Sequence, residues 1–186
     1  MIFPELKELN TPRLHLRKLT MADAPLYYAR ITSRPEICQY MLWEPHTDLS
    51  QTEAVIQKIH SRYACGCCYR WCIALAEDDS PIGSIELLRF EETESTCSFA
   101  YMISADHWGM GYGTEALQAV MRFAFETMQI KEIIVDHMAA NPASGAVMRK
   151  AGMTFLRHIP KKYEKSGKRM DAEEYCITHE QWKSQQ

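Results

Sequence analysis

The sequence predicts an α+β fold, a single domain in which helices flank a mixed, mostly antiparallel sheet of about seven strands. Two observations predict it. Three strand-like segments in the middle of the chain follow one another through short turns, the pattern of an antiparallel meander. A helical pattern then separates the third segment from a continuous apolar run, and this order favours parallel pairing through a crossover of roughly 28 residues.

Composition and charge narrow the class of protein. The chain has 186 residues, the size of one ordinary domain, and its formal net charge is -3. A near-neutral charge argues against a dedicated nucleic-acid binder, whose affinity depends on a positive surface. No apolar run reaches the roughly 20 residues that cross a bilayer, and the first five residues lack the start of a secretory signal. We expect a cytoplasmic protein that binds neither nucleic acid nor membrane.

No linker, repeat or low-complexity segment interrupts the chain, so we expect one domain over residues 9–182 with tails at 1–8 and 183–186. It is expected to be a monomer or a homodimer. The number of cysteines is 7, and an odd number fits reduced thiols. The cluster at 65–72 lacks a second ligand pair at zinc spacing, so we expect free thiols there and no metal.

The N-terminal part predicts one strand and two helices. Leucines alternate with charged or polar side chains over 13–18, the period of a half-buried strand. Residues 20–23, Thr to Asp, have the spacing of a capping box and predict a helix over 20–31. The same spacing at 50–53 precedes an apolar stripe and predicts a second helix over 50–63.

The middle of the chain predicts the meander. Its strands are expected at 69–76, 82–90 and 96–103, separated by the turn-forming run 77–81 and the acidic residues 91–94.

The C-terminal part predicts the remaining elements. Apolar residues at three- and four-residue steps predict a helix over 117–128, and a continuous apolar run predicts a strand over 132–138 that is covered on both faces. Asn141 is a suitable N-cap, and Pro142 after it suits the first position of a helix that ends at Ala151. Two strands at 155–164 and 169–178 form a closing hairpin.

A glycine-rich turn over residues 107–115 joins the third meander strand to a helix. Its three glycines, Gly109, Gly111 and Gly113, let the backbone approach a ligand closely. The unpaired amides of the helix start face the same space, and such a turn holds a phosphate without a basic side chain. The alternative is a turn that only redirects the chain.

Two familiar phosphate motifs fit the glycine-rich turn poorly. A Walker A loop has a lysine after its last glycine, whereas Thr114 follows Gly113 here. The dinucleotide fingerprint has its third glycine three residues after the second, whereas Gly113 comes two residues after Gly111. The spacing indicates a different phosphate cradle.

The sequence Gly111-Tyr112-Gly113 resembles the end of the acyl-CoA-binding motif of the GNAT-superfamily N-acetyltransferases. In that motif an Arg or Gln stands three residues before the first of these glycines, and here the position is Trp108, as in a subgroup similar to RimJ and RimL. Other segments that resemble this subgroup are Thr11–Leu14, Trp108–Ala116, Asn141–Gly145, Lys150–Met153 and the closing Asp171 to Tyr175. The resemblance extends over about Leu9 to Trp182.

The resemblance implies that acetyl-CoA is the co-substrate. Backbone amides of the glycine-rich turn would bind its pyrophosphate. The 96–103 strand would splay from the 132–138 strand and free main-chain groups for the pantetheine arm. The coenzyme-binding residues implied are Tyr101, Ile103, Gly109, Met110, Gly111, Tyr112, Gly113, Thr114, Asn141 and Ser144.

The reaction implied is a direct attack of a neutral primary amine on the thioester in a ternary complex. The backbone amide of Ile103 is our candidate for polarising the thioester carbonyl, a contribution of about 3 kcal/mol. Many members carry a tyrosine seven residues after the asparagine as the general acid, but Met148 stands there, which leaves the acid unassigned.

The amine must lose a proton before it attacks, so a base or a water relay is needed. Glu86 and His137 are the candidates, with Asp136 behind them. Glu86 lies among apolar residues of a strand expected to be central, where burial raises a carboxyl pKa. The alternatives are a carboxylate on a solvated face for Glu86 and a structural donor for His137.

The expected acceptor is a primary amine, either a protein N-terminus such as that of a ribosomal protein or a small molecule. Tyr40, Met41 and Trp43 line its pocket or belong to an ordinary core. A non-catalytic acyl-CoA-binding module is the alternative function. A nucleotide-binding protein is a third reading, against which the missing Walker lysine argues.

Overall fold

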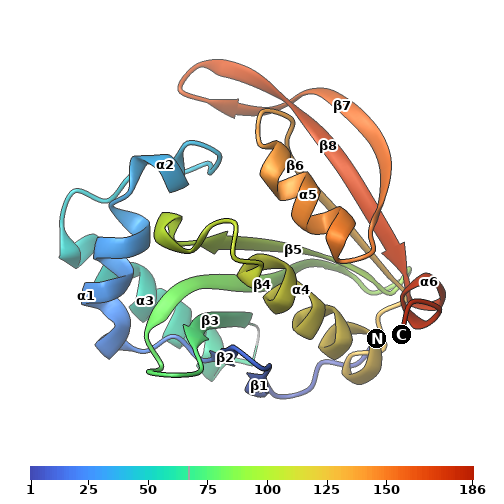
Figure 1. Ribbon diagram of the computed structural model, residues 1–186, viewed down its shortest axis with the longest axis horizontal. Helices are drawn as coiled ribbons and strands as arrows, with labels where there is room; N and C mark the ends of the chain where they lie inside the picture. Colours follow the sequence, from blue (N-terminus) through green and yellow to red (C-terminus); the bar gives the residue numbers. More distant parts are fainter. Residues whose placement is uncertain (67) are drawn as a thin grey trace.

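The computed structural model describes residues 1–66 and 68–186. One eight-stranded sheet crosses the molecule in the order β1-β2-β3-β4-β5-β6-β8-β7 (Figure 1). β5 and β6 pair in parallel, and all the other neighbours are antiparallel. The strands are β1 (Leu9–Asn10), β2 (Leu14–Arg17), β3 (Tyr69–Leu75), β4 (Pro81–Glu91), β5 (Thr96–Ile103), β6 (Glu132–Met138), β7 (Thr154–Lys165) and β8 (Lys168–Thr178). The mixed, mostly antiparallel sheet is confirmed, and the two-residue β1 is its unpredicted strand.

Helices cover both faces of this sheet. The helices are α1 (Ala24–Tyr27), α2 (Pro35–Cys38), α3 (Leu49–Ala64), α4 (Tyr112–Arg122), α5 (Pro142–Lys150) and α6 (His179–Lys183). A large apolar core joins α4 and α5 to one face, and a smaller one joins α1 and α3 to the other. In the described part of the chain, no helix is long and apolar enough to cross a membrane.

The helix starts test the capping predictions. Asp23 accepts a hydrogen bond from the backbone N–H of Thr20 at 2.7 Å, as predicted, and Asn141 accepts one from the amide of Ser144 at 3.3 Å. The predicted cap at Ser50 is wrong. Asp48 caps α3 instead and accepts from the amide of Gln51, because an earlier carboxylate reaches the same free amides.

The first eight residues, expected as a tail, lie against the core. The hydroxyl of Tyr69 donates to the carbonyl of Pro4 at 2.6 Å, and the indole of Trp71 donates to that of Lys7 at 2.7 Å. Leu6 packs on the main apolar core. The strands β1 and β2 that follow lie beside α4, and the connection between them reaches the glycine-rich turn.

The cysteines depart in part from the expectation of free thiols. Cys68 and Cys72 are buried free thiols, whereas Cys65 is disulfide-bonded. Cys67, also in the predicted thiol cluster, lies outside the described residues. Among the residues that the structure describes, no group of three His, Cys, Asp or Glu side chains is placed to hold a metal ion.

Candidate active site

The site begins where β5 and β6 part. These parallel strands pair at Thr96 with Glu132 and at Cys97 with Ile133. Beyond these two positions the described register ends, although β5 continues to Ile103 alongside β4. The predicted splay is therefore present, and one edge of β5 loses its neighbour for the rest of the strand.

The register shows which backbone groups face this gap. The amide of Ser104 donates to the carbonyl of Ile82 at 2.7 Å, so even-numbered positions of β5 bond to β4. Tyr101 and Ile103 are odd-numbered, and their N–H and C=O groups point toward the gap. The indole of Trp108 donates to the carbonyl of Ile103 at 2.8 Å. The amide of Ile103 and both main-chain groups of Tyr101 remain directed into the gap.

The glycine-rich turn forms a second wall. Gly109 and Gly111 have φ of 76° and 84°, in the left-handed region that glycine adopts without strain. Gly111 is the N-cap of α4, so the free amides of the first helical turn begin at Tyr112. This arrangement suits an anion, as the sequence predicts.

Side chains from the short connection between β1 and β2 hold the glycine-rich turn in place. Glu115, in the first turn of α4, accepts hydrogen bonds from the hydroxyl of Thr11 at 2.6 Å and from Nε of Arg13 at 2.7 Å. The guanidinium of Arg13 also donates to the carbonyl of Met110 at 2.9 Å and lies 4.6 Å from the ring centre of Tyr112. We call this set of contacts the Arg13–Glu115 clasp.

The third wall is α5. The hydroxyl of Tyr101 reaches across from β5 and donates to Oγ of Ser144 at 3.3 Å. Burial raises the pKa of this phenol, although the hydrogen bond to Ser144 acts against that rise. The Tyr101 hydroxyl is therefore protonated at neutral pH. Met148 is buried in the core below.

A cavity of about 500 Å³ fills the space between these walls. The glycine-rich turn lines what we call the coenzyme side, within residues 109–114, although Met110 is exposed and is not part of the lining. The helix α2 and the residues after it line what we call the acceptor side, within residues 36–41. Tyr101, Ile103, Asn141 and Ser144 lie between them. Most of the predicted coenzyme-binding residues thus meet around one cavity.

Neither predicted base lines this cavity in the described structure. The carboxylate of Glu86 is buried and bound by two guanidinium groups, with Oε1 at 2.9 Å from Arg62 and Oε2 at 2.8 Å from Nε of Arg70. Asp136 pairs with Arg89 at 3.2 Å. Both carboxylates are structural ion pairs in this geometry.

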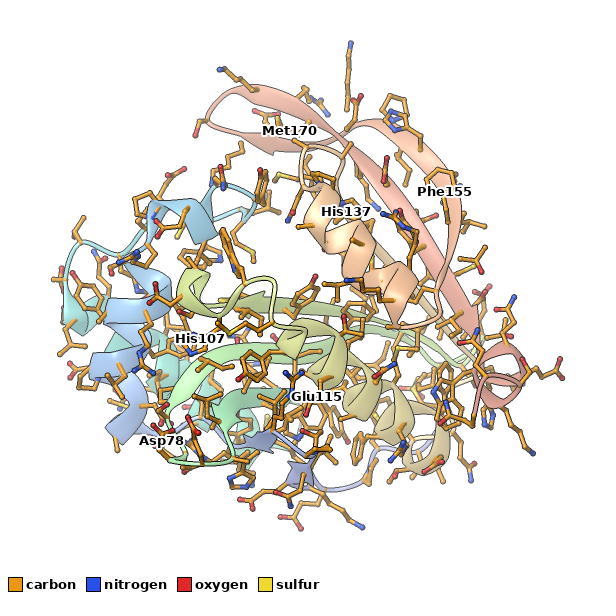
Figure 2. The ribbon with its side chains drawn as sticks, in the orientation of Figure 1. Asp78, His107, Glu115, His137, Phe155 and Met170 are labelled. Atoms are coloured by element: carbon orange, nitrogen blue, oxygen red, sulfur yellow. The ribbon has the colours of Figure 1, made fainter. Side chains whose placement is uncertain are left out.

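His137 lies next to α5, on the other side of the gap from His107 (Figure 2). Its Nδ1 lies 2.8 Å from the carbonyl of Met138, and its ring stacks on Tyr175 with the ring centres 5.6 Å apart. A Cβ added at Gly145 would lie 2.8 Å from Nε2, so α5 packs directly onto this imidazole.

Three titratable side chains that the sequence analysis did not assign to the site line the cavity: Glu36, His107 and Lys150. Glu36, on α2, is bound by Arg34 at 2.7 Å. A hydrogen bond from its own backbone N–H and one from Arg34 hold the pKa of Glu36 below its usual value. His107 is the first residue of the glycine-rich turn, and its Nδ1 is buried and unpaired among the described residues. A four-residue helix gives no periodic signal, so α2 could not be anticipated.

Comparison with known proteins gives the family context. The family model described as the acetyltransferase (GNAT) domain matches residues 13–154. An uncharacterized N-acetyltransferase, p20, of Bacillus licheniformis is 30% identical over 128 residues, which cover 69% of this chain and 71% of that protein.

Solved structures share the fold. RimL, a ribosomal L7/L12 α-N-protein acetyltransferase in complex with coenzyme A, superposes with a TM-score of 0.81 and 18% identity over 92% of this chain and 98% of that chain. The spermidine N-acetyltransferase of Vibrio cholerae, in complex with CoA and spermine, has a TM-score of 0.78 and 18% identity over 92% and 99%. At this identity the likeness concerns the fold.

Proposed function

The chain belongs to the acetyltransferase (GNAT) family and is an acetyl-CoA-dependent acyltransferase, and from this premise we propose that it acetylates a primary amine in a RimJ/RimL-like reaction. One observation carries the proposal. The amides at the start of α4 and the unpaired edge of β5 open into the same cavity. An anion-binding end next to a row of amide-binding groups suits a diphosphate with a pantetheine arm.

Coenzyme binding is proposed to use mainly backbone groups. Amides from Met110 to Thr114 hold the pyrophosphate, and Gly109 and Gly111 allow the chain to follow it closely. Main-chain groups of Tyr101 and the amide of Ile103 pair with the pantetheine arm, and Asn141 hydrogen-bonds to it from α5. Support comes from the register of β5, which directs these groups away from β4.

The chemical step is proposed to use the same groups. The amine nitrogen bonds to the thioester carbon, the carbon–sulfur bond breaks, and a proton leaves the nitrogen while the thiolate takes one up. The amide of Ile103 stabilises the developing oxyanion. Because Ser144 accepts from Tyr101, its own hydroxyl proton is free to stabilise the thiolate.

We propose that the acceptor enters along the acceptor side, because the coenzyme occupies the glycine-rich turn. Glu36 is a carboxylate on that side, and its lowered pKa keeps it ionised at neutral pH. It attracts an ammonium group before deprotonation. A protein N-terminus and a polyamine both meet this requirement, and the names of RimL and the spermidine N-acetyltransferase cover both kinds of amine.

A cytoplasmic location is part of the proposal. It is supported by five described free cysteines, Cys38, Cys68, Cys72, Cys97 and Cys176, since free thiols persist in a reducing compartment. The disulfide at Cys65 is the observation that weighs against it.

Calorimetry and a thiol-release assay test the proposal. Coenzyme A titrated into the purified chain should release or absorb heat, and acetyl-CoA should yield free thiol only when an amine is added. The amine panel should contain N-terminal peptides, amino acids and polyamines. Binding without amine-dependent thiol release would support the acyl-CoA-binding module, and no binding would refute the coenzyme site itself.

A further inference from the structure

Two segments that are far apart in the sequence meet beside the acceptor side of the cavity. One is the tip of the β7–β8 hairpin, and the other is residues 39–44 after α2, which we call the 39–44 segment. A β-bulge between Ile159 and Tyr163 bends β7. The far end of the hairpin consequently lies on the same side of the molecule as α2 (Figure 1).

The hairpin tip is a tight turn that presents one lysine. Lys165 pairs with Lys168 across two residues. Ser166 and Gly167 between them have φ of 49° and 73°, as in a type I′ turn. Such a turn fixes the direction of both strand ends, and so it fixes where the lysine side chain starts.

The ammonium group of Lys165 is bound to the backbone around the 39–44 segment. Its Nζ donates to the carbonyl oxygens of Cys38 at 2.5 Å and Met41 at 2.7 Å, and lies 3.4 Å from that of Trp43. The carboxylate of Glu44 is 4.0 Å away, and the Lys165 side chain is 16% exposed. Three donors thus have three acceptors in a partly desolvated place, where such hydrogen bonds are stronger than in water.

The 39–44 segment forms part of the cavity wall, since Gln39, Tyr40 and Met41 line it. Its other polar contacts are local, for example the bond from the Gln39 side chain to the carbonyl of Glu36 at 2.9 Å. Among the described residues, its hydrogen bonds and ion pairs to any residue beyond His46 come from Lys165 and Ser166. The hairpin tip is therefore the long-range support of this wall.

We propose that Lys165 is a positioning residue for the acceptor amine. By tying three carbonyl oxygens to the hairpin tip, it holds Tyr40 and Met41 at the acceptor side of the cavity. The expected effect on the KM for the amine rests on the proposed acetyl transfer. The expected effect on the structure of the 39–44 segment rests on the contacts of Lys165 alone.

The test compares Lys165→Met with Lys168→Met. Methionine keeps an apolar stem of similar length and removes the charge and the three donors. Lys168 is exposed and lies across the same turn, and its side chain makes no hydrogen bond or ion pair in the described structure, so it is a matched control. Lys165→Arg keeps the charge but replaces a point donor by a planar fork, and it should restore part of the effect.

For Lys165→Met we expect faster amide hydrogen exchange in peptides covering residues 38–44, and a KM for the amine raised about tenfold. The Kd for coenzyme A and kcat should stay within about twofold of the wild type. Lys168→Met should match the wild type in all four measurements.

Unchanged exchange at 38–44, or an equal rise in the Kd for coenzyme A, would overturn the inference. An equal effect of Lys168→Met would overturn it too. Hydrogen exchange is measured without an acceptor amine, so it decides on its own whether Lys165 holds the 39–44 segment. If the wild type acetylates no amine, that result refutes the proposed function and leaves the inference about Lys165 to the exchange measurement.

Discussion

The two sides of the cavity are held in different ways. On the coenzyme side, the Arg13–Glu115 clasp joins charged side chains to each other, and its carboxylate lies on the first turn of α4. On the acceptor side, Lys165 binds carbonyl oxygens of the backbone. The clasp requires a particular side chain at both ends, whereas the Lys165 tie requires one only on the hairpin. The side chains of the 39–44 segment can therefore change without loss of the tie.

The largest effect is expected from a substitution on the coenzyme side of the cavity, Gly111→Glu. Glutamate at Gly111 forces a side chain into the left-handed region and places a negative charge where the diphosphate is expected, with the Arg13 guanidinium 3.4 Å from the new Cβ. We expect Gly111→Glu to raise the Kd for coenzyme A about a hundredfold or more, measured by calorimetry.

The control for Gly111→Glu is Gly167→Glu. Gly167 also has a positive φ, 73°, and the space around its Cβ position is open. This variant introduces the same charge and a similar backbone strain at the hairpin tip. If Gly111→Glu binds coenzyme A as tightly as Gly167→Glu and the wild type do, the glycine-rich turn is not the diphosphate site.

Local signals made much of the fold predictable. The predicted bounds of β5 and β6 match the structure because turns on both sides and an apolar run leave little freedom in register. The Asn141 cap and the Lys165–Lys168 turn were also predictable, since each depends on residues that are at most three positions apart in the sequence.

The long-range contacts could not be predicted. The clasp joins residues 102 positions apart, and the Lys165 tie joins residues 127 positions apart. A single sequence carries no signal for such pairs. The candidate bases could not be judged for the same reason, because the sequence does not reveal which partners surround a carboxylate or an imidazole. The arginines beside Glu86 and the packing of α5 on His137 become visible only in the structure.

A smaller effect is expected from loosening the clasp. Glu115→Gln removes the charge that Arg13 and Thr11 bind, and we expect a loss of roughly 1 kcal/mol in unfolding free energy, since Arg13 is half exposed. The Kd for coenzyme A should rise about fivefold, because the turn is held less firmly. Glu126→Gln, on the turn after α4, is the control and should change neither value.

The difference in unfolding free energy between wild type and Glu115→Gln should depend on pH in a definite direction. Burial raises the pKa of Glu115, but hydrogen bonds from Thr11 and Arg13 outweigh it and leave the pKa below the usual 4.5. A carboxyl whose pKa is lowered by folding stabilises the folded state at pH values above its pKa in the unfolded chain. That contribution is lost as the pH falls through the lowered pKa. Urea unfolding should therefore show a full difference between wild type and Glu115→Gln near neutral pH and a vanishing one in acid. A difference that grows in acid would contradict the clasp.

The smallest effect concerns charge on the acceptor side. Glu36→Gln should raise the KM for a cationic amine about threefold, because the side chain is partly exposed, at 35%, and already pairs with Arg34. The effect should shrink as salt is added, since exposed charges are screened, while the Kd for coenzyme A should not change. Glu53→Gln, on α3 outside the cavity lining, alters the net charge equally and serves as the control. If both variants raise the KM alike, the whole surface attracts the amine, and Glu36 has no special part in selecting it.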